Sequence, residues 1–307
     1  MAGNTANSVK SIGHIVVLIA LLVGLLGLLT WSGIVQCSVI PGYCDVYYSV
    51  LGEPKILIYE GNDGIGNPAQ LQKVLTDPQF LNLRADLKHY NFLSIENLKE
   101  YDLIIVEHAK TLPTKKLKDL TDYINSGKKI IWIGDSGTQM PLSEQSKDLF
   151  LYRDEVYSDK PHEKIGAWAR KTEEGKVLNL ENFISVHYLG NYCDVNSRCI
   201  NPKGRTGQFI PTDTDNPLIY GIRSDLPYYG DFAIVEDIAG LGTKIVMSID
   251  AGQPIKNSEP ENITPAIVTS GTVNSKITYY AFPLEQLLEE PNQAPTLLEN
   301  MYRGTFK

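Results

Sequence analysis

The sequence predicts an α/β protein with a three-layer, open, mostly parallel sheet, preceded by one transmembrane helix. From residue 55 onward, short apolar runs alternate with amphipathic segments of helical period. The segments that follow these runs are rich in Gly, Asp and Asn, as expected for turns at strand ends. A long uncharged run near the N-terminus predicts the membrane helix.

Length and charge limit the classes of function. The chain has 307 residues, enough for one large or two ordinary domains with a buried core. Its formal net charge of -8 argues against polyanion partners, so we predict no nucleic-acid binding. The glycines in GNDGIG are spaced in the reverse order of the dinucleotide-binding fingerprint. We therefore predict no cofactor, and we assign no metal site.

The N-terminal run Ile15–Val35 carries no charge and is long enough to cross a hydrocarbon core of about 30 Å as a helix. Lys10 precedes the run, whereas Asp45 and Glu53 follow it before any basic residue. The positive-inside rule therefore places residues 1–14 in the cytoplasm and the C-terminal domain outside the cell. A cleaved signal peptide is the alternative.

The four cysteines form two close pairs, Cys37 with Cys44 and Cys193 with Cys199. Local pairs around turn-forming residues are typical of disulfides in an oxidising compartment. A zinc site is the alternative, but the gaps within the pairs are wider than the usual two to four residues. A glycosylation sequon at Asn262 agrees with an extracytoplasmic domain.

The first part of the domain reads as alternating strands and helices after a linker over residues 36–54. Strands are predicted for KILIYE from Lys55, for residues 83–87, for YDLIIVEH, and for KKIIWIGDSG. One helix begins at Asn67 and Pro68, which suit the cap and the first turn, and another runs from Pro113 to Gly127. Parallel strands joined by such helices form an open α/β sheet.

The rest of the predicted domain, which spans residues 55–307, begins with an insertion at about residues 141–217. The insertion contains one predicted strand, NFISVHYL. Strands FAIVED, TKIVMSI, AIVTS and KITYYAF follow, and the last two are predicted to form a hairpin. A final amphipathic helix is predicted from about Pro295 to Gly304.

The carboxyl ends of parallel strands form the ligand crevice in open α/β sheets. Four carboxylates, Glu60, Asp63, Glu107 and Asp135, are predicted at this edge. Their oxygens are candidates for binding a cation or a polyhydroxylated ligand. The alternative is that these side chains are polar because strand-end loops are hydrated.

Three stretches, YDLIIVEHAKTLPTKKLKDLTDYINSGKKIIWIGDSG, NPLIYGI and PAIVTSGTVNSKITYYAFPLEQL, occur in this order. In this order they resemble the class I glutamine amidotransferase-like domains, in particular the membrane-associated and trehalose-utilisation-like branch. The resemblance covers residues 53–307 except the insertion. It implies a flavodoxin-like sheet.

Active members of that family use a Cys in the pattern G-x-C-x-G and a His before Pro. In this sequence the Cys place is Ser136, the second Gly place is Thr138, and the His place is Phe282. Phenylalanine cannot accept a proton, so Ser136 lacks the base that would activate it. The resemblance therefore implies that glutaminase activity is absent.

Our leading hypothesis is a membrane-anchored, extracytoplasmic and catalytically degenerate domain that acts in binding or assembly. Its expected partners are membrane lipid through residues 15–35 and an envelope protein or a carbohydrate. One alternative is an extracytoplasmic hydrolase of a carbohydrate or ester, with Ser136 as nucleophile and His108 as base. Another is a structural component of an envelope or transporter complex. For Ser136, a simple turn or cap role is the competing interpretation.

Overall fold

The structure is a computed structural model of the chain. It describes residues 3–31, 52, 54–77, 81, 83–195, 205–222, 226–238, 243–252, 262–270, 277–289, 298, 300, 302 and 305. The chain divides into two compact units, one of Met1–Glu53 with Phe306–Lys307 and one of Pro54–Thr305.

The first unit contains helix α1, Gly3–Trp31, and the structure describes the side chains of its residues 14–29. Within the described part of the chain, no helix combines the length and the apolarity of a membrane span. The predicted transmembrane helix at residues 15–35 is therefore wrong, as is the single-pass localisation derived from it. Residues 32–35 of that prediction lie outside the described residues.

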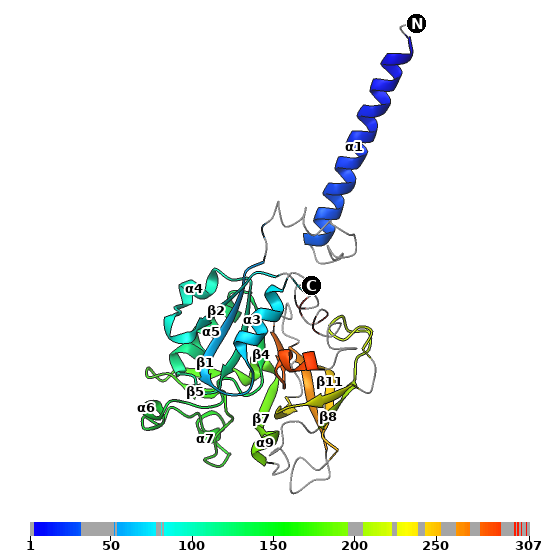
Figure 1. Cartoon of the computed structure of the whole chain (residues 1–307). Coiled ribbons are helices and arrows are strands. Elements are labelled where there is room, and N and C mark those ends of the chain that lie inside the picture. The colour runs from blue at the N-terminus through cyan, green and yellow to red at the C-terminus, as the bar shows by residue number, and fades with distance from the viewer. Residues whose placement is uncertain are drawn as a thin grey trace. The chain divides into compact units, whose positions relative to one another are not determined.

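The second unit is built on a nine-stranded sheet (Figure 1). Its spatial order is β2 (Ala85–His89), β1 (Ile56–Asp63), β3 (Leu103–Ala109), β4 (Lys129–Ile133), β13 (Ile277–Tyr280), β12 (Ile263–Thr269), β11 (Lys244–Asp250), β8 (Arg205–Pro211) and β9 (Pro227–Tyr229). The neighbouring pairs from β2 to β13 are parallel. The pairs from β13 to β9 are antiparallel.

The prediction of a mostly parallel sheet is therefore wrong, because the sheet is mixed. A parallel pair needs a crossover of a dozen or more residues, usually through a helix. Such crossovers occur between the strands of the first half, whereas β11, β12 and β13 follow one another in sequence and pair antiparallel. The predicted hairpin corresponds to the pair β12–β13, and its connecting residues 271–276 lie outside the described residues.

Helices and two small sheets complete the second unit. The helices are α3 (Pro68–Thr76), η2 (Tyr90–Phe92), α4 (Ile95–Lys99), α5 (Thr114–Asn125), α6 (Leu142–Gln145), α7 (Arg153–Val156), α8 (Glu181–Ile184), α9 (Tyr192–Val195) and η4 (Leu284–Glu289). One small sheet pairs β5 (Ala169–Lys171) with β6 (Val177–Asn179), and the other pairs β7 (Val186–Asn191) with β10 (Ala233–Asp237). The stretch NFISVHYL, predicted as one strand, is divided between α8 and β7.

The core lies against the central parallel strands. Side chains alternate between the two faces of a strand, and one face of β1, β3, β4 and β13 joins a core that includes residues of α4, α5 and α8. Helix α3 packs against β1 and β2 and buries Leu71, Val74 and Leu75. Burial of each such side chain contributes about 1.5–3 kcal/mol. These contacts fix the strand ends that carry the candidate site.

Arg170 on β5 is a buried cation in this framework, with 1% of its surface exposed. Its guanidinium donates hydrogen bonds to the carbonyl oxygens of Leu112, Gly137 and Gln139. Burial lowers the pKa of Arg170 to about 10, so the side chain stays protonated at neutral pH. Arg170 thus joins the segments that follow β3 and β4.

We expect Arg170→Met to lower the free energy of unfolding by about 3 kcal/mol, because buried carbonyl oxygens lose a charged donor. Urea denaturation measures this change. The neighbouring Lys171 forms a surface ion pair with Glu155, at 2.8 Å, so Lys171→Met should change stability by less than about 1 kcal/mol. Equal effects of the two substitutions would contradict the role given to Arg170.

Candidate functional site

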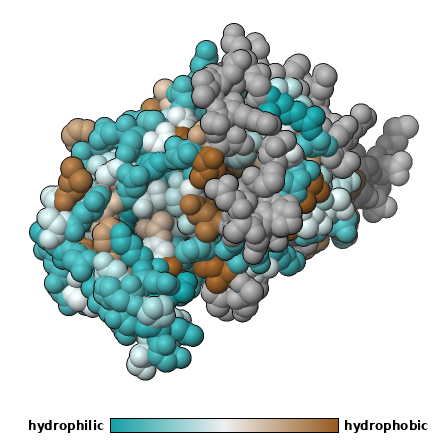
Figure 2. All heavy atoms as spheres, turned by 90° about the horizontal axis from the view of Figure 1, so that it is seen from below, coloured by the Kyte–Doolittle hydropathy of each residue, from teal (hydrophilic) through white to brown (hydrophobic). Residues whose placement is uncertain are grey.

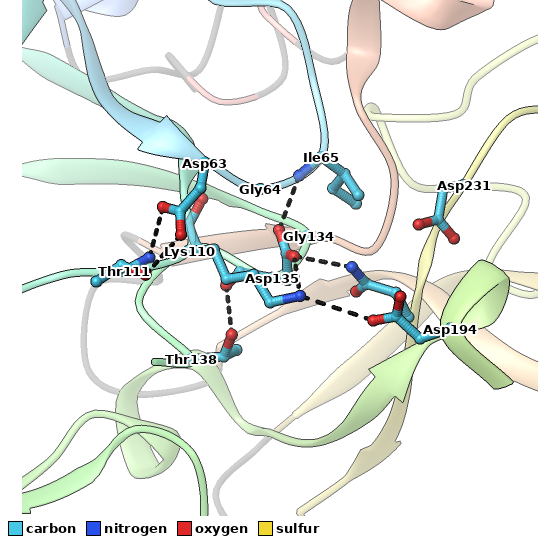
Figure 3. Close-up of polar contacts among 12 residues, drawn as sticks. Asp63, Gly64, Ile65, Lys110, Thr111, Gly134, Asp135, Thr138, Asp194 and Asp231 are labelled. Carbon is cyan, nitrogen blue, oxygen red and sulfur yellow. Dashed lines mark hydrogen bonds and ion pairs between the residues drawn. The ribbon is translucent and has the colours of Figure 1, made fainter. Parts of the chain in front are cut away.

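The segments that follow β1, β3 and β4 meet at the carboxyl edge of the parallel strands (Figure 3). Asp63 ends β1, Lys110 and Thr111 follow β3, and Asp135 follows β4. This convergence follows from the parallel pairing, which brings the carboxyl ends of neighbouring strands to one edge.

Asp135 is the centre of this group and is fully buried. Its Oδ1 accepts a hydrogen bond from the backbone N–H of Ile65 at 3.0 Å. Its Oδ2 accepts one from the side-chain amide of Asn191 at 2.8 Å and lies 3.3 Å from Lys110 Nζ. Asp135 therefore connects the loop after β1, the segment after β3 and the end of β7.

Lys110 lies between a buried and an exposed carboxylate. Its Nζ is also 3.7 Å from Asp194 Oδ2, and the Lys110 and Asp194 side chains are 19% and 65% exposed. Figure 3 shows Asp63 and Asp194 on opposite sides of Asp135. The ammonium group is therefore both held in place by Asp135 and reachable from solvent.

Asp231 adds a second carboxylate on the Asp194 side (Figure 3). Its Oδ1 accepts hydrogen bonds from the backbone N–H groups of Cys193 and Phe232, both at 2.9 Å. Burial, with a smaller contribution from the charges of Asp194 and Asp135, raises the pKa of Asp231 to about 6. Asp231 therefore changes charge close to neutral pH.

Asp63 has a structural role at the same edge. Its Oδ1 accepts a hydrogen bond from the N–H of Thr111 at 2.9 Å, and its Oδ2 accepts one from Thr111 Oγ1 at 2.5 Å. The backbone N–H of Lys110 donates to the Asp63 carbonyl oxygen at 2.8 Å. These contacts fix the backbone from which Lys110 extends.

Ser136 is enclosed by the turn on which it lies and has no exposed surface. Its Oγ donates to the carbonyl oxygen of Val106 at 3.5 Å, which is a weak contact. Its own carbonyl oxygen accepts hydrogen bonds from the indole groups of Trp132 and Trp168, at 2.9 and 2.7 Å. Gly137, with φ +72°, makes room for the Trp132 ring, which lies 3.0 Å from the position of a Cβ. The geometry agrees with the turn interpretation of Ser136.

The ring of His108 contacts the loop after β1 rather than Ser136. Its Nδ1 lies 2.7 Å from the carbonyl oxygen of Gly64 and therefore acts as the donor of that contact. Its backbone has a φ of 51°, which is strained for a residue other than glycine. In the described structure, no hydrogen bond connects His108 with Ser136.

Glu60 and Glu107 are neighbours in register on β1 and β3, but Glu107 is fully buried. Neither carboxyl oxygen of Glu107 has a hydrogen-bond donor within the described residues. Burial and the adjacent Glu285 on η4 raise the pKa of Glu107 well above its usual value. Glu107 and Asp135, both predicted at strand ends, thus have different partners: Glu107 lies beside Glu285, whereas Asp135 contacts Ile65, Asn191 and Lys110.

Phe282, at the place of the family histidine, lies in a closed aromatic cluster and has no exposed surface. Its ring centroid is 4.7 Å from that of Phe209, 5.4 Å from that of Tyr228 and 6.1 Å from that of Tyr280. No side chain of this cluster can accept a proton from Ser136.

The remaining predicted sites are only partly described. Cys193 on α9 is disulfide-bonded, whereas Cys37, Cys44 and Cys199 lie outside the described residues. The side-chain amide of Asn262 donates to Asp250 Oδ1 at 2.7 Å, and glycosylation there stays a prediction. Among the residues that the structure describes, no three His, Cys, Asp or Glu side chains are placed to hold a metal ion.

Sequence reasoning missed Lys110, Asn191, Asp194 and Asp231. Lys110 stands two positions after His108, so its place directly after a predicted strand was a usable signal. Asn191 and Asp194 flank Cys193, in the part of the chain predicted as an insertion. Nothing in the sequence shows that this part returns to the edge of the sheet.

No family model matches the chain, and no curated protein matches it. Several solved structures are similar. A putative thua-like protein from Bacteroides uniformis ATCC 8492 has 14% identity and a TM-score of 0.49, over 82% of this chain and 92% of that chain. A β-galactosidase from Rahnella sp. R3 has 12% identity and a TM-score of 0.50, over 85% of this chain and 32% of that chain.

An α-L-fucosidase isoenzyme 2 from Paenibacillus thiaminolyticus is also similar, with 12% identity and a TM-score of 0.46, over 85% of this chain and 34% of that chain. The chain thus spans about a third of the length of the β-galactosidase that it matches. At these identities the likeness concerns the fold alone.

We expect Asp135→Asn to lower the free energy of unfolding by about 2–3 kcal/mol. The substitution removes the charge that pairs with Lys110 and places an amide N–H group against one of three donors. Chemical denaturation measures the change, and Asp194→Asn is the matched control. Because Asp194 is exposed, its substitution should change stability by less than about 0.5 kcal/mol. Equal losses would show that Asp135 does not hold the edge together.

Proposed function

We propose that Pro54–Thr305 is a binding module with an amidotransferase-like fold that lacks the hydrolytic chemistry of the active family members. The proposal rests on the environments of Ser136 and Phe282, the residues at the places of the family's catalytic Cys and His. Phe282 is packed among aromatic rings, and the hydroxyl of Ser136 is enclosed. A serine hydroxyl needs both an adjacent base and access to substrate to act as a nucleophile.

The hydrolase alternative receives no support from the contacts of its two residues. Ser136 Oγ approaches Val106, and the His108 ring contacts the loop after β1. On the face drawn in Figure 2, the hydrophobic residues that the view leaves uncovered lie in groups among hydrophilic ones. The alternative of a structural component stays a prediction.

The group around Lys110 supports a polyhydroxylated ligand, such as a carbohydrate. Lys110 supplies an ammonium donor, and the exposed Asp194 supplies acceptor oxygens on the same side. Neighbouring donors and acceptors suit hydroxyl groups, each of which can donate and accept a hydrogen bond. Asp135 fixes the position of the ammonium group before a ligand arrives, which reduces the entropy lost on binding.

We expect the full chain to hydrolyse glutamine and p-nitrophenyl acetate no faster than its Ser136→Ala variant, since neither base nor access is present. Initial rates of both proteins, compared with a buffer blank, test this. Circular dichroism of the variant serves as the control for folding. A rate in the wild type that falls at least about tenfold in a folded Ser136→Ala variant would contradict the proposal.

We expect the full chain to bind neutral polyols, with D-galactose, D-glucose and myo-inositol as probes in saturation-transfer NMR. Lys110→Met and Asp194→Asn should each weaken the binding about tenfold, since a lost charged hydrogen bond is worth roughly 1.4 kcal/mol or more. Lys171→Met removes a lysine from another surface and should leave the affinity unchanged. Absence of binding by all three probes at millimolar concentration would overturn the assigned ligand class.

A further inference from the structure

The segment Gly64–Asn67, which we call the 64–67 loop, connects β1 to α3 at the edge where Lys110 lies (Figures 1 and 3). Three titratable side chains contact its backbone. They are His108, with Nδ1 2.7 Å from Gly64 O, Asp135, with Oδ1 3.0 Å from Ile65 N, and Glu285, with Oε1 2.7 Å from Asn67 N. The closed position of the loop thus depends on three side-chain contacts with its backbone.

Glu107 lies directly against this loop. A Cβ on Gly66 would be 2.7 Å from both Cγ and Oε1 of Glu107, and Gly66 has a φ of +106°. Only glycine allows this close approach and this backbone conformation. The position of the Glu107 carboxyl group and the closed loop are therefore linked by direct packing.

Glu107 and Glu285 form a buried pair of carboxyl groups, with 0% and 1% of their surfaces exposed. Both oxygens of Glu107 and the Oε2 of Glu285 lack a hydrogen-bond donor in the described structure. Two adjacent buried carboxylates cannot both be charged at an acceptable free energy, whereas one shared proton satisfies the pair. Burial raises the pKa of both groups, and Glu285 raises that of Glu107 further.

The titratable side chains named below face the pair, and none of them is a Lys or Arg that would neutralise its charge. Tyr228 on β9 and Tyr302 are buried, and burial raises the pKa of each well above its usual value, so both stay uncharged. Tyr280 on β13 lies next to Tyr302 and is also uncharged, since burial raises its pKa. His108 also faces the pair and favours the charged form of Glu285. A proton on Glu107 is therefore the simplest way to stabilise the pair.

We propose that the Glu107–Glu285 pair is a pH-sensitive latch, in which one shared proton holds the 64–67 loop closed over the Lys110 edge. When the proton leaves to solvent, the two carboxylates repel each other, and Glu285 withdraws from the N–H of Asn67. Release of the loop also removes the N–H of Ile65 from Asp135 and so opens the site around Lys110. The link to ligand binding rests on the proposed function, but the latch does not.

The direction of the pH effect follows from the raised pKa of the folded pair. In the open loop, the carboxyl groups have ordinary pKa values of about 4.3. The closed state therefore binds more protons, and its advantage is complete below that value and lost as the pH rises through the folded pKa. At pH values between the pKa of the open state and that of the closed state, the equilibrium constant for loop opening rises about tenfold per pH unit. Above the pKa of the closed state this constant no longer changes.

Hydrogen–deuterium exchange of the full chain from pH 5 to pH 9 tests the latch without any ligand. We expect the protection of residues 61–70, corrected for the intrinsic exchange rate, to fall about tenfold per pH unit in that window and then level off. Glu107→Gln removes the repulsion within the pair, so its loop should lose protection over a narrower pH range than the wild-type loop. Glu285→Gln keeps an acceptor for Asn67 and should behave in the same way, which covers the case that Glu107→Gln does not fold. Glu60→Gln, on the adjacent strand, should retain the behaviour of the wild type.

Three results would overturn the latch. The first is loop protection that does not change with pH in the wild type. The second is a pH range of opening that is as wide in both glutamine variants as in the wild type. The third is recovery of protection at high pH on addition of calcium or magnesium chloride, since a cation rather than a proton would then occupy the pair. A pH-dependent loop in a protein that binds none of the polyol probes would leave the latch intact and overturn only the proposed function.

Discussion

The candidate site depends on the burial of one charge, the carboxylate of Asp135. A buried carboxylate is stable only when its oxygens are paired, and Asp135 meets this requirement with donors from three separate segments. The requirement therefore determines where the loop after β1, the segment after β3 and the end of β7 lie. The turn from Gly134 is fixed further by the two indoles that donate to Ser136 O. The position of Lys110 is a consequence of these constraints.

The same constraints explain why the turn after β4 does not support hydrolysis. The backbone conformation that satisfies Asp135 and the two tryptophans directs Ser136 Oγ toward Val106 in the interior. At the place of the family's catalytic histidine, the aromatic ring of Phe282 packs against Tyr228 and stabilises the packing there. Most polar groups at this edge thus hold the backbone, whereas Asp194 faces solvent. This division is suited to binding.

Local sequence patterns predicted the strands β1, β3 and β4 and the helices α3 and α5, because each has a periodic apolar face and recognisable ends. Asn67 and Pro68 begin α3 as expected, with the Asn67 side chain accepting from Gln70 N at 3.2 Å. The mixed pairing of the second half was not predicted, because strand direction depends on connections rather than on apolar runs. The membrane helix was inferred from an uncharged run alone, and the described structure does not support it.

Long-range partners were beyond the reach of local patterns. Asn67 and Glu285 are 218 positions apart, and Asn191 and Asp135 are 56 apart, so neither contact leaves a trace in spacing. Glu107 shows the limit most clearly. It was predicted at the crevice because it lies at a strand end, but its side chain is fully buried beside Glu285, a residue 178 positions further along the chain.

Three departures from ordinary structural rules lie at one edge of the sheet. The strained backbone of His108, the Gly66 conformation that only glycine adopts readily, and the unpaired carboxyl oxygens of Glu107 all adjoin the 64–67 loop. Each lowers stability, and a well-packed apolar residue in place of Glu107 would avoid one of these losses. Such losses are expected where function requires two states of similar free energy. A loop held by a single proton is such an element, because protonation changes its stability while the central strands stay packed.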